Sequence, residues 1–261
     1  MVRFELRNEN LNEIDKIAYS LSAETGLSLP MARMLCLRKI TTESEVEAFF
    51  NPSLNQLEDP YSILDMDKAV KRIEDAIKNN QKICIFGDYD ADGICATAML
   101  YMYLSYIGAN VIYYIPSRHT EGYGLSAEAI DKLYSQNVRL IVTVDNGISA
   151  KNEIAHAKSL GLDCIVTDHH TCVGEIPDCV AVLCHTRTDN TYKNTSLCGA
   201  GIALKVIQAM GGVNAAVHFV PFAGLATVAD IVELTPENRA IVSVALSIMN
   251  SPDCPLGNAA L

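Results

Sequence analysis

Short apolar runs alternate with stretches of helical periodicity from residue 82 onward. Five of the runs have the length and composition of strands that are buried on both faces. They cover residues 83–86, 111–115, 140–144, 164–167 and 180–183. Helices are predicted between them at residues 94–106, 127–134 and 150–160, the last capped by Gly161. Because each helix returns the chain to the same end of the sheet, neighbouring strands pair in parallel. The pattern predicts an α/β fold, with a doubly wound, mostly parallel sheet flanked by helices.

The part of the chain before the first strand is predicted to be helical. Apolar residues recur at three-and-four spacing in residues 12–22, 30–37, 43–50 and 67–79. Asn51-Pro52 interrupts this pattern. The expected organisation is a helical N-terminal extension over residues 1–79, an α/β domain over residues 80–245 and a C-terminal linker over residues 246–261.

Acidic and imidazole side chains follow four apolar segments at the point where each segment ends. They are Asp88, Asp90 and Asp92 after the first run, Asp145 after the third, Asp168, His169 and His170 after the fourth, and Asp230 after residues 226–229. Parallel strands lie about 4.8 Å apart and end at one edge of the sheet, so these side chains can share ligands. Two divalent ions roughly 3.5–4 Å apart need such a cluster, and they hold the attacking and leaving oxygens of a phosphoryl transfer. The sequence therefore predicts a two-metal site.

The stretch from Asp88 to Gly93 also allows two simpler interpretations. Acids at alternate positions before a glycine occur in calcium loops, but the bidentate Glu that such a loop needs is absent, and the stretch follows a strand. A stretch rich in Asp and Gly is also typical of a solvated turn. Acids at successive strand ends, together with the His169-His170 pair, favour the metal site.

The order of these motifs resembles a known family. GDYDADG (87–93), TVDNG (143–147), TDHH (167–170) and TVADIVEL (227–234), with SLCGAGIALK (196–205) before the last, resemble the motifs of the DHH phosphoesterase superfamily in its RecJ branch. Residues 51–73, 115–126 and 236–241 are also similar to that branch, so the resemblance covers nearly the whole chain. His185-Thr186 is a departure, because RecJ relatives commonly have Asn-Pro there.

The resemblance implies two bound ions, Mn²⁺ or Mg²⁺, as cofactors. One ion is expected on Asp90 and Asp145 with Asp88 nearby, and the other on Asp92, Asp145, His169 and Asp230, so that Asp145 bridges the two. Ligands that are mostly oxygen, with one imidazole, favour these ions over zinc.

The resemblance also implies groups that act on the substrate. His170 is expected to face the substrate phosphate, as a hydrogen-bond donor or in proton transfer near the leaving oxygen; a purely supporting role is the alternative. Asp168 is expected to accept a hydrogen bond from the metal-bound histidine.

Three more residues are candidates for contact with the substrate phosphate. Gly199 and Gly201 resemble a helix start whose backbone N–H groups bind an anion. Arg118 is a candidate phosphate clamp, with a surface ion pair to Glu121 as the alternative.

By this resemblance the chain is expected to hydrolyse single-stranded DNA from the 5′ end, with metal-activated water as nucleophile. Two alternatives stay open: hydrolysis of short oligoribonucleotides, cyclic dinucleotides or pyrophosphate, and a non-catalytic assembly module. Such modules tend to lose metal ligands, which this sequence retains. The RecJ family continues with a DHHA1 domain and an oligonucleotide-binding domain, and neither is found before Leu261, so the chain is expected to be truncated or a shortened relative. The oligomeric state is left open.

Charge and composition limit the partners. With 20 basic against 31 acidic residues the net charge is −11, which argues against phosphate neutralisation over the whole surface. Bound divalent cations would reverse the local field where phosphate must approach. Nine cysteines without a C-x-x-C spacing indicate neither a disulfide framework nor a zinc site. No apolar run approaches the roughly 18 residues of a membrane span and no signal peptide is evident, so no membrane partner and a cytoplasmic location are expected.

Overall fold

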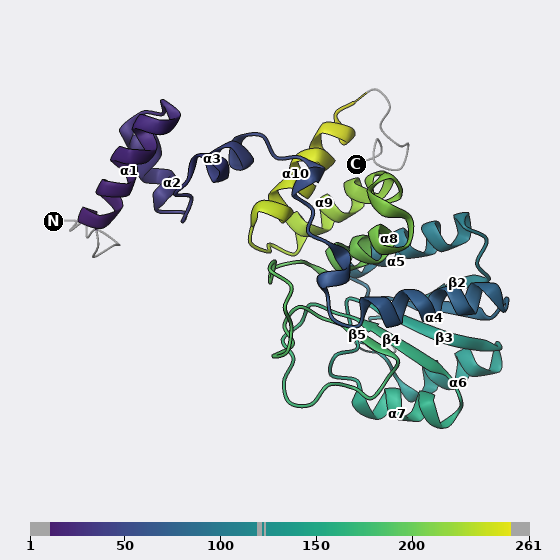
Figure 1. Ribbon diagram of the computed structural model, residues 1–261. Helices are drawn as coiled ribbons and strands as arrows, with labels where there is room; N and C mark the ends of the chain where they lie inside the picture. The colour runs from purple at the N-terminus through teal and green to yellow at the C-terminus, as the bar shows by residue number, and fades with distance from the viewer. Residues whose placement is uncertain (1–10, 119–121, 123, 252–261) are drawn as a thin grey trace. The chain divides into compact units, whose positions relative to one another are not determined.

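The computed structural model describes residues 11–118, 122 and 124–251 of the chain (Figure 1). The chain forms two compact units that divide between Ser53 and Leu54. The first unit contains the helices α1 (Leu11–Thr25), α2 (Leu29–Cys36) and α3 (Glu43–Phe50). Their apolar faces meet in a small core of Ala18, Leu21, Ala32, Leu35, Cys36 and Val46. Each predicted helix of this unit is present.

The second unit is built on a five-stranded parallel sheet. The strands are β1 (Lys82–Phe86), β2 (Val111–Tyr114), β3 (Val138–Val144), β4 (Asp163–Thr167) and β5 (Ala181–Leu183). Their order is β2-β1-β3-β4-β5, and every neighbouring pair is parallel. The sheet confirms the predicted α/β class and all five predicted strands.

Helices cover both faces of this sheet because successive strand residues point to opposite faces. Ile83 and Ile85 of β1 pack with α4 (Met66–Lys78), α5 (Ala91–Tyr106) and α8 (Gly199–Ala216). Cys84 and Phe86 of the same strand pack with α6 (Ala127–Ser135) and α7 (Lys151–Ser159). The remaining helices, α9 (Val220–Ala229) and α10 (Pro236–Met249), pack against each other, and α9 also contacts α5 and α8. Short 3-10 helices lie at Leu54–Gln56, Pro60–Ser62 and Val217–Phe219.

The boundary of the N-terminal extension differs from the one predicted at residues 79 and 80. The helix α4 belongs to the second unit, because Met66, Ala69, Val70 and Ile73 are buried in the core between the sheet and its covering helices α5 and α8. Helical periodicity identified the apolar face of α4 but carried no information on which surface covers it. At the other end, residues 246–249 of the predicted linker form the last turn of α10, and residues 252–261 lie outside the described part.

A buried polar network joins four separate segments of the second unit. Lys205 on α8 is fully buried, and its Nζ donates to Glu237 Oε1 at 2.8 Å and to the carbonyl oxygen of Glu58 at 2.5 Å. Tyr192 Oη donates to Glu237 Oε2 at 2.7 Å, and Asn194 Nδ2 donates to the same oxygen at 2.9 Å. Burial lowers the pKa of the Lys205 ammonium, while Glu237 opposes that shift. These bonds connect α8 and α10 to the chain that precedes α4.

The stretch Gly199–Ala229 is long and apolar enough to cross a membrane, by length and composition alone. This differs from the expectation of no such segment, which considered only uninterrupted apolar runs. Gly212, with φ 73°, introduces a kink within α8, and α8 packs in the core against α4 and α5. The stretch therefore forms core helices of the α/β unit, and its single lysine, Lys205, is paired with Glu237.

Candidate metal centre

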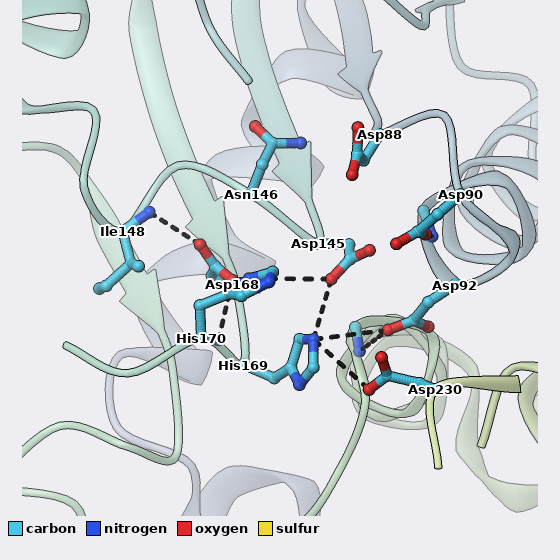
Figure 2. Close-up of polar contacts among 12 residues, drawn as sticks. Asp88, Asp90, Asp92, Asp145, Asn146, Ile148, Asp168, His169, His170 and Asp230 are labelled. Carbon is cyan, nitrogen blue, oxygen red and sulfur yellow. Dashed lines mark hydrogen bonds and ion pairs between the residues drawn. The ribbon is translucent and has the colours of Figure 1, made fainter. Parts of the chain in front are cut away.

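The predicted metal ligands gather at the edge of the sheet where β1 and β3 end (Figure 2). The chain passes from β1 to β2 on one side, whereas β3 lies on the other side of β1, and such a switch point leaves a crevice at the carboxyl ends of the strands. Asp88 and Asp90 follow β1, Asp92 lies in the first turn of α5, and Asp145 follows β3. Asp230 reaches the same place from the end of α9.

The ligand atoms form three groups in which all atoms lie within 4.8 Å of one another. The groups are Asp88 with Asp90 and Asp145, Asp92 with His169 and Asp230, and Asp145 with His169 and His170. His169 Nε2 lies 3.1 Å from Asp145 Oδ1, and 3.7 Å from both Asp92 Oδ2 and Asp230 Oδ2. Asp145 therefore stands between the ligand sets predicted for the two ions.

A left-handed turn after β3 aims the Asp145 carboxylate into the crevice. Asp145 has φ 63°, which is uncommon for a residue other than glycine, and Gly147 follows with φ 108°. Asn146 fixes the turn, because its Nδ2 donates to the carbonyl oxygens of Phe86 at 3.2 Å and of Val144 at 2.9 Å. Strained backbone of this kind persists where the surrounding structure over-determines it, often at functional sites.

The crowded carboxylates favour a bound cation. Burial, with a further contribution from the Asp92 charge, raises the pKa of Asp145 to about 7, although the hydrogen bond with His169 opposes the shift. Burial also raises the pKa of Asp88 and of Asp230. Nearby negative charges that are costly to ionise are stabilised by a divalent cation. The donors are oxygen-rich with an imidazole, so the residues present fit Mn²⁺ or Mg²⁺.

Asp92 is held by the start of α8. The backbone N–H groups of Gly199 and Ala200 donate to its two carboxylate oxygens at 2.6 and 2.7 Å, and Asp92 is only 2% exposed. The N–H of Gly199 thus has a carboxylate partner in place of the predicted phosphate, and Gly201 is buried against Leu197. The start of α8 does bind an anion, because the dipole of a helix favours negative charge at its N-terminus. That anion is a side chain of the chain itself.

Asp168 orients His170 and not His169, which corrects the predicted pairing. His170 Nδ1 lies 2.7 Å from Asp168 Oδ1, and the N–H of Ile148 donates to Asp168 Oδ2 at 2.9 Å (Figure 2). The hydrogen bond with Asp168 raises the pKa of His170 to about 9. Burial raises the pKa of Asp168, but the bonds from His170 and Ile148 outweigh it and hold the pKa below its usual range. Near neutral pH, His170 is therefore a cationic donor in the metal-free protein.

The Asp168 and His170 pair predicts a pH dependence of stability. His170 titrates at about 9 in the folded state, above its ordinary pKa of ~6.5. The folded state then binds more protons than the unfolded state between these pH values. The stability that protonated His170 contributes is therefore fully present below pH ~6.5 and is lost as pH rises through about 9. In Asp168→Asn the loss of stability between pH ~6.5 and 9 should be smaller, and the His170 pKa should fall. Urea unfolding in EDTA measures the stability, and an NMR titration of the imidazole measures the His170 pKa. An unchanged His170 pKa would contradict the pairing.

Arg118 lies beside the cluster from the segment that follows β2. Its guanidinium carbon is 5.4 Å from the centre of the Tyr89 ring, and its charge acts to lower the pKa of Asp88. Arg118 is exposed, so it is available to a ligand. Glu121, the alternative partner, lies outside the described residues. The phosphate contact of Arg118 stays a prediction.

Comparison with known proteins places this site in a family. The family model described as the DHH family, N-terminal domain, matches residues 82–229. The chain belongs to the DHH family. The matched segment begins at β1 and ends one residue before Asp230.

Curated relatives of this DHH-family chain are named single-stranded-DNA-specific exonuclease RecJ. That of Bacillus subtilis (strain 168) is 34% identical over 94% of this chain and 30% of the relative. That of Escherichia coli (strain K12) is 32% identical over 92% of this chain and 44% of the relative. The chain thus spans less than half the length of these relatives.

Two solved structures are similar. The crystal structure of exonuclease RecJ bound to manganese has a TM-score of 0.67 and 31% identity, over 74% of this chain and 49% of that one. The structure of RecJ in complex with Mn²⁺ from Thermus thermophilus has a TM-score of 0.74 and 26% identity, over 90% of this chain and 33% of that one.

Gly199 has a role in this DHH site that its sequence motif did not indicate. A Cβ atom at Gly199 would lie 2.6 Å from Asp145 Cβ and 2.9 Å from Asp145 Oδ1. Only glycine lets the start of α8 approach closely enough to bind Asp92 while Asp145 stays in place. The motif marked Gly199 as a helix start, whereas its contacts come from residues far away in the sequence.

Gly199→Ala is expected to weaken Mn²⁺ binding about tenfold, because displaced supporting groups typically cost 10–100-fold in metal affinity. The added methyl group would overpack the contact between α8 and Asp145, which should also cost about 1–3 kcal/mol of unfolding free energy. Calorimetric Mn²⁺ titration and thermal unfolding measure the two effects. Gly201→Ala is the matched control, because its Cβ would meet only the movable Leu197 side chain, at 3.1 Å. Equal Mn²⁺ affinity in both variants would show that the close approach at Gly199 is unimportant.

Proposed function

We propose that this chain is the catalytic DHH part of a RecJ-like single-stranded-DNA-specific 5′–3′ exonuclease that hydrolyses phosphodiester bonds with two metal ions. The single observation that carries the proposal is the position of Asp145. It shares one group of possible ligand atoms with Asp88 and Asp90 and another with His169, at the switch point of the sheet. Two ligand groups joined through one carboxylate are the arrangement that a two-metal phosphoesterase requires.

The residues divide into two ligand sets. Asp90 and Asp145, with Asp88 nearby, would hold one ion, and Asp92, Asp145, His169 and Asp230 would hold the other. The related RecJ proteins have solved structures with Mn²⁺, which supports Mn²⁺ or Mg²⁺ here. Such a pair of ions lowers the pKa of bound water and neutralises charge on the phosphoryl oxygens.

The protein's own groups position the substrate and move the proton. His170, held through Nδ1 by Asp168, would donate a hydrogen bond to a phosphate oxygen or a proton to the leaving oxygen. The hydrogen bond with Asp168 favours the protonated form of His170, the form that can donate a proton. Arg118 stands on the Tyr89 side of the cluster, where a guanidinium would hold a substrate phosphate. The backbone of α8 keeps Asp92 in place throughout.

Single-stranded DNA is proposed as substrate because the curated relatives carry that specificity in their names. A net charge of −11 and the absence of tryptophan predict weak binding of long strands by this chain. DNA as substrate also supports a cytoplasmic location.

The test is hydrolysis by the purified chain in Mn²⁺ of 5′-labelled and 3′-labelled single strands, with duplex DNA, oligoribonucleotides and a cyclic dinucleotide in parallel. The proposal expects EDTA-sensitive release of mononucleotides from the 5′ end of single-stranded DNA. Faster hydrolysis of oligoribonucleotides or of the cyclic dinucleotide would reassign the substrate. Binding without hydrolysis of any substrate, with Mn²⁺ bound, would indicate an assembly module.

A further inference from the structure

We infer that a cavity beside His170 is a subsite for one nucleobase, that of the terminal nucleotide next to the bond that is cut. This inference rests on the proposed function. The cavity has a volume of about 410 Å³ and lies at the carboxyl ends of the strands. Its size is within the range of ~300–1,000 Å³ that small-molecule pockets have. Another cavity, of about 200 Å³, lies at the opposite end of β4 around Asp163 and Cys179, away from the metal centre.

The cavity lies next to the metal centre. His170 and Asp168 are among its lining residues, and His170 Nδ1 is 4.0 Å from Asp145 Oδ1. The turn after β3, from Gly147 to Ala150, forms one wall, and Leu125 before α6 forms another. A phosphate held at the metal centre would therefore have its adjoining nucleoside within reach of this cavity.

The lining fits a base better than it fits a phosphate. Leu125 and Ile148 are buried apolar side chains that can cover the face of a planar ring. Asp168 is paired with His170, whereas Glu153 contributes a carboxylate, and the described residues that line the cavity include neither lysine nor arginine. A second phosphate beside Glu153 would meet negative charge, because like charges repel.

Glu153 gives the subsite a preference among bases. A carboxylate accepts hydrogen bonds only, and the exocyclic amino group of cytosine is a donor that Glu and Asp side chains recognise. Thymine offers a single N–H, and the two carbonyl oxygens that flank this N–H are repelled by a carboxylate. A strand that ends in cytosine should therefore bind better than one that ends in thymine.

The test uses dCMP binding and terminal-base discrimination by the 261-residue chain in Mn²⁺. Ser149→Trp fills the cavity from its exposed rim, and Glu153→Gln removes the charge while keeping the shape. Asn152→Trp is the matched control, because Asn152 is exposed nearby at the start of α7 and does not line the cavity. Calorimetry measures dCMP, dTMP and Mn²⁺ affinity, and single-turnover assays compare strands ending in cytosine, thymine or an abasic nucleotide.

The wild type and Asn152→Trp should bind dCMP more tightly than dTMP and cut the cytosine end roughly tenfold faster than the abasic end, a factor worth ~1.4 kcal/mol. Ser149→Trp should lose dCMP binding and this discrimination, and Glu153→Gln should lose the cytosine preference, both with unchanged Mn²⁺ affinity. Equal rates on cytosine and abasic ends in the wild type, or retained dCMP binding in Ser149→Trp, would overturn the subsite and leave the exonuclease proposal intact. If no strand is hydrolysed at all, dCMP affinity in the four proteins still decides whether the subsite exists.

Discussion

Asp145→Asn is expected to lower Mn²⁺-dependent hydrolysis by at least about 10²–10³-fold, the range seen when a group that stabilises the transition state directly is removed. The loss should be large because Asp145 is shared by two possible ligand groups, so both ion sites lose a charged oxygen. Initial rates on a labelled single strand, at several Mn²⁺ concentrations, measure the effect. Recovery of the wild-type rate at high Mn²⁺ would show that Asp145 only tightens metal binding.

The same substitution should leave the metal-free fold intact, or stabilise it above neutral pH. The pKa of Asp145 is raised to about 7 in the folded state, whereas an unfolded aspartate titrates near ~3.9. The folded state therefore retains a proton that the unfolded state releases between these values, and stability falls as pH rises through that window. Asparagine removes this penalty.

Unfolding in EDTA and in Mn²⁺ separates the two effects. The wild type should gain stability from Mn²⁺, because a ligand that binds only the folded state stabilises it, and Asp145→Asn should gain little. Asp163→Asn, at the amino end of β4, is the control, since Asp163 pairs with Arg72 away from the cluster. Marked destabilisation of metal-free Asp145→Asn would show that the carboxylate is structural.

Lys205→Met is expected to cost about 3–5 kcal/mol of unfolding free energy, the range for removing one partner of a buried ion pair. Lys205 is fully buried and Glu237 is 3% exposed, so Glu237 would be left as a buried charge with only neutral donors around it. Urea unfolding of the metal-free chain measures the loss. Because this network lies away from the metal ligands, folded Lys205→Met should keep near-normal Mn²⁺ affinity.

A double variant identifies the cause of that loss. Lys205→Met combined with Glu237→Gln removes both charges and keeps an amide that can accept from Tyr192 and Asn194. It should be clearly more stable than Lys205→Met alone, since coupled residues are not additive. Arg72→Met is a comparison on a half-exposed pair, where a loss of about 1 kcal/mol or less is expected. A double variant no more stable than Lys205→Met would point to lost packing in place of lost pairing.

The sheet could be predicted because its signals are local. A run such as residues 140–144 is apolar almost throughout, and only a strand covered on both faces needs that composition. The acids after the first, third and fourth runs were placed at one edge by the same argument, because parallel strands end together. Those side chains do meet in the structure, and the order of motifs led to the DHH family.

The supporting contacts could not be predicted because their partners are far apart in the chain. Asp92 is bound by backbone N–H groups 107 and 108 residues away, and the motif around Gly199 only marked a helix start. Asp168 could have oriented either neighbouring histidine, and its carboxylate is held toward His170 by the N–H of Ile148, which lies 20 residues earlier in the chain.

The sequence by itself determined the strands, the helix faces and the kinds of ligand at the sheet edge, because hydrophobic periodicity and residue chemistry act over a few neighbouring positions. Only the tertiary structure decided that Asp145 adopts a left-handed conformation, that α8 holds Asp92, that α4 packs under the sheet and that Lys205 meets Glu237. These features depend on the close approach of distant segments. Steric fit and the need to satisfy buried polar groups select that approach only when the whole unit has folded.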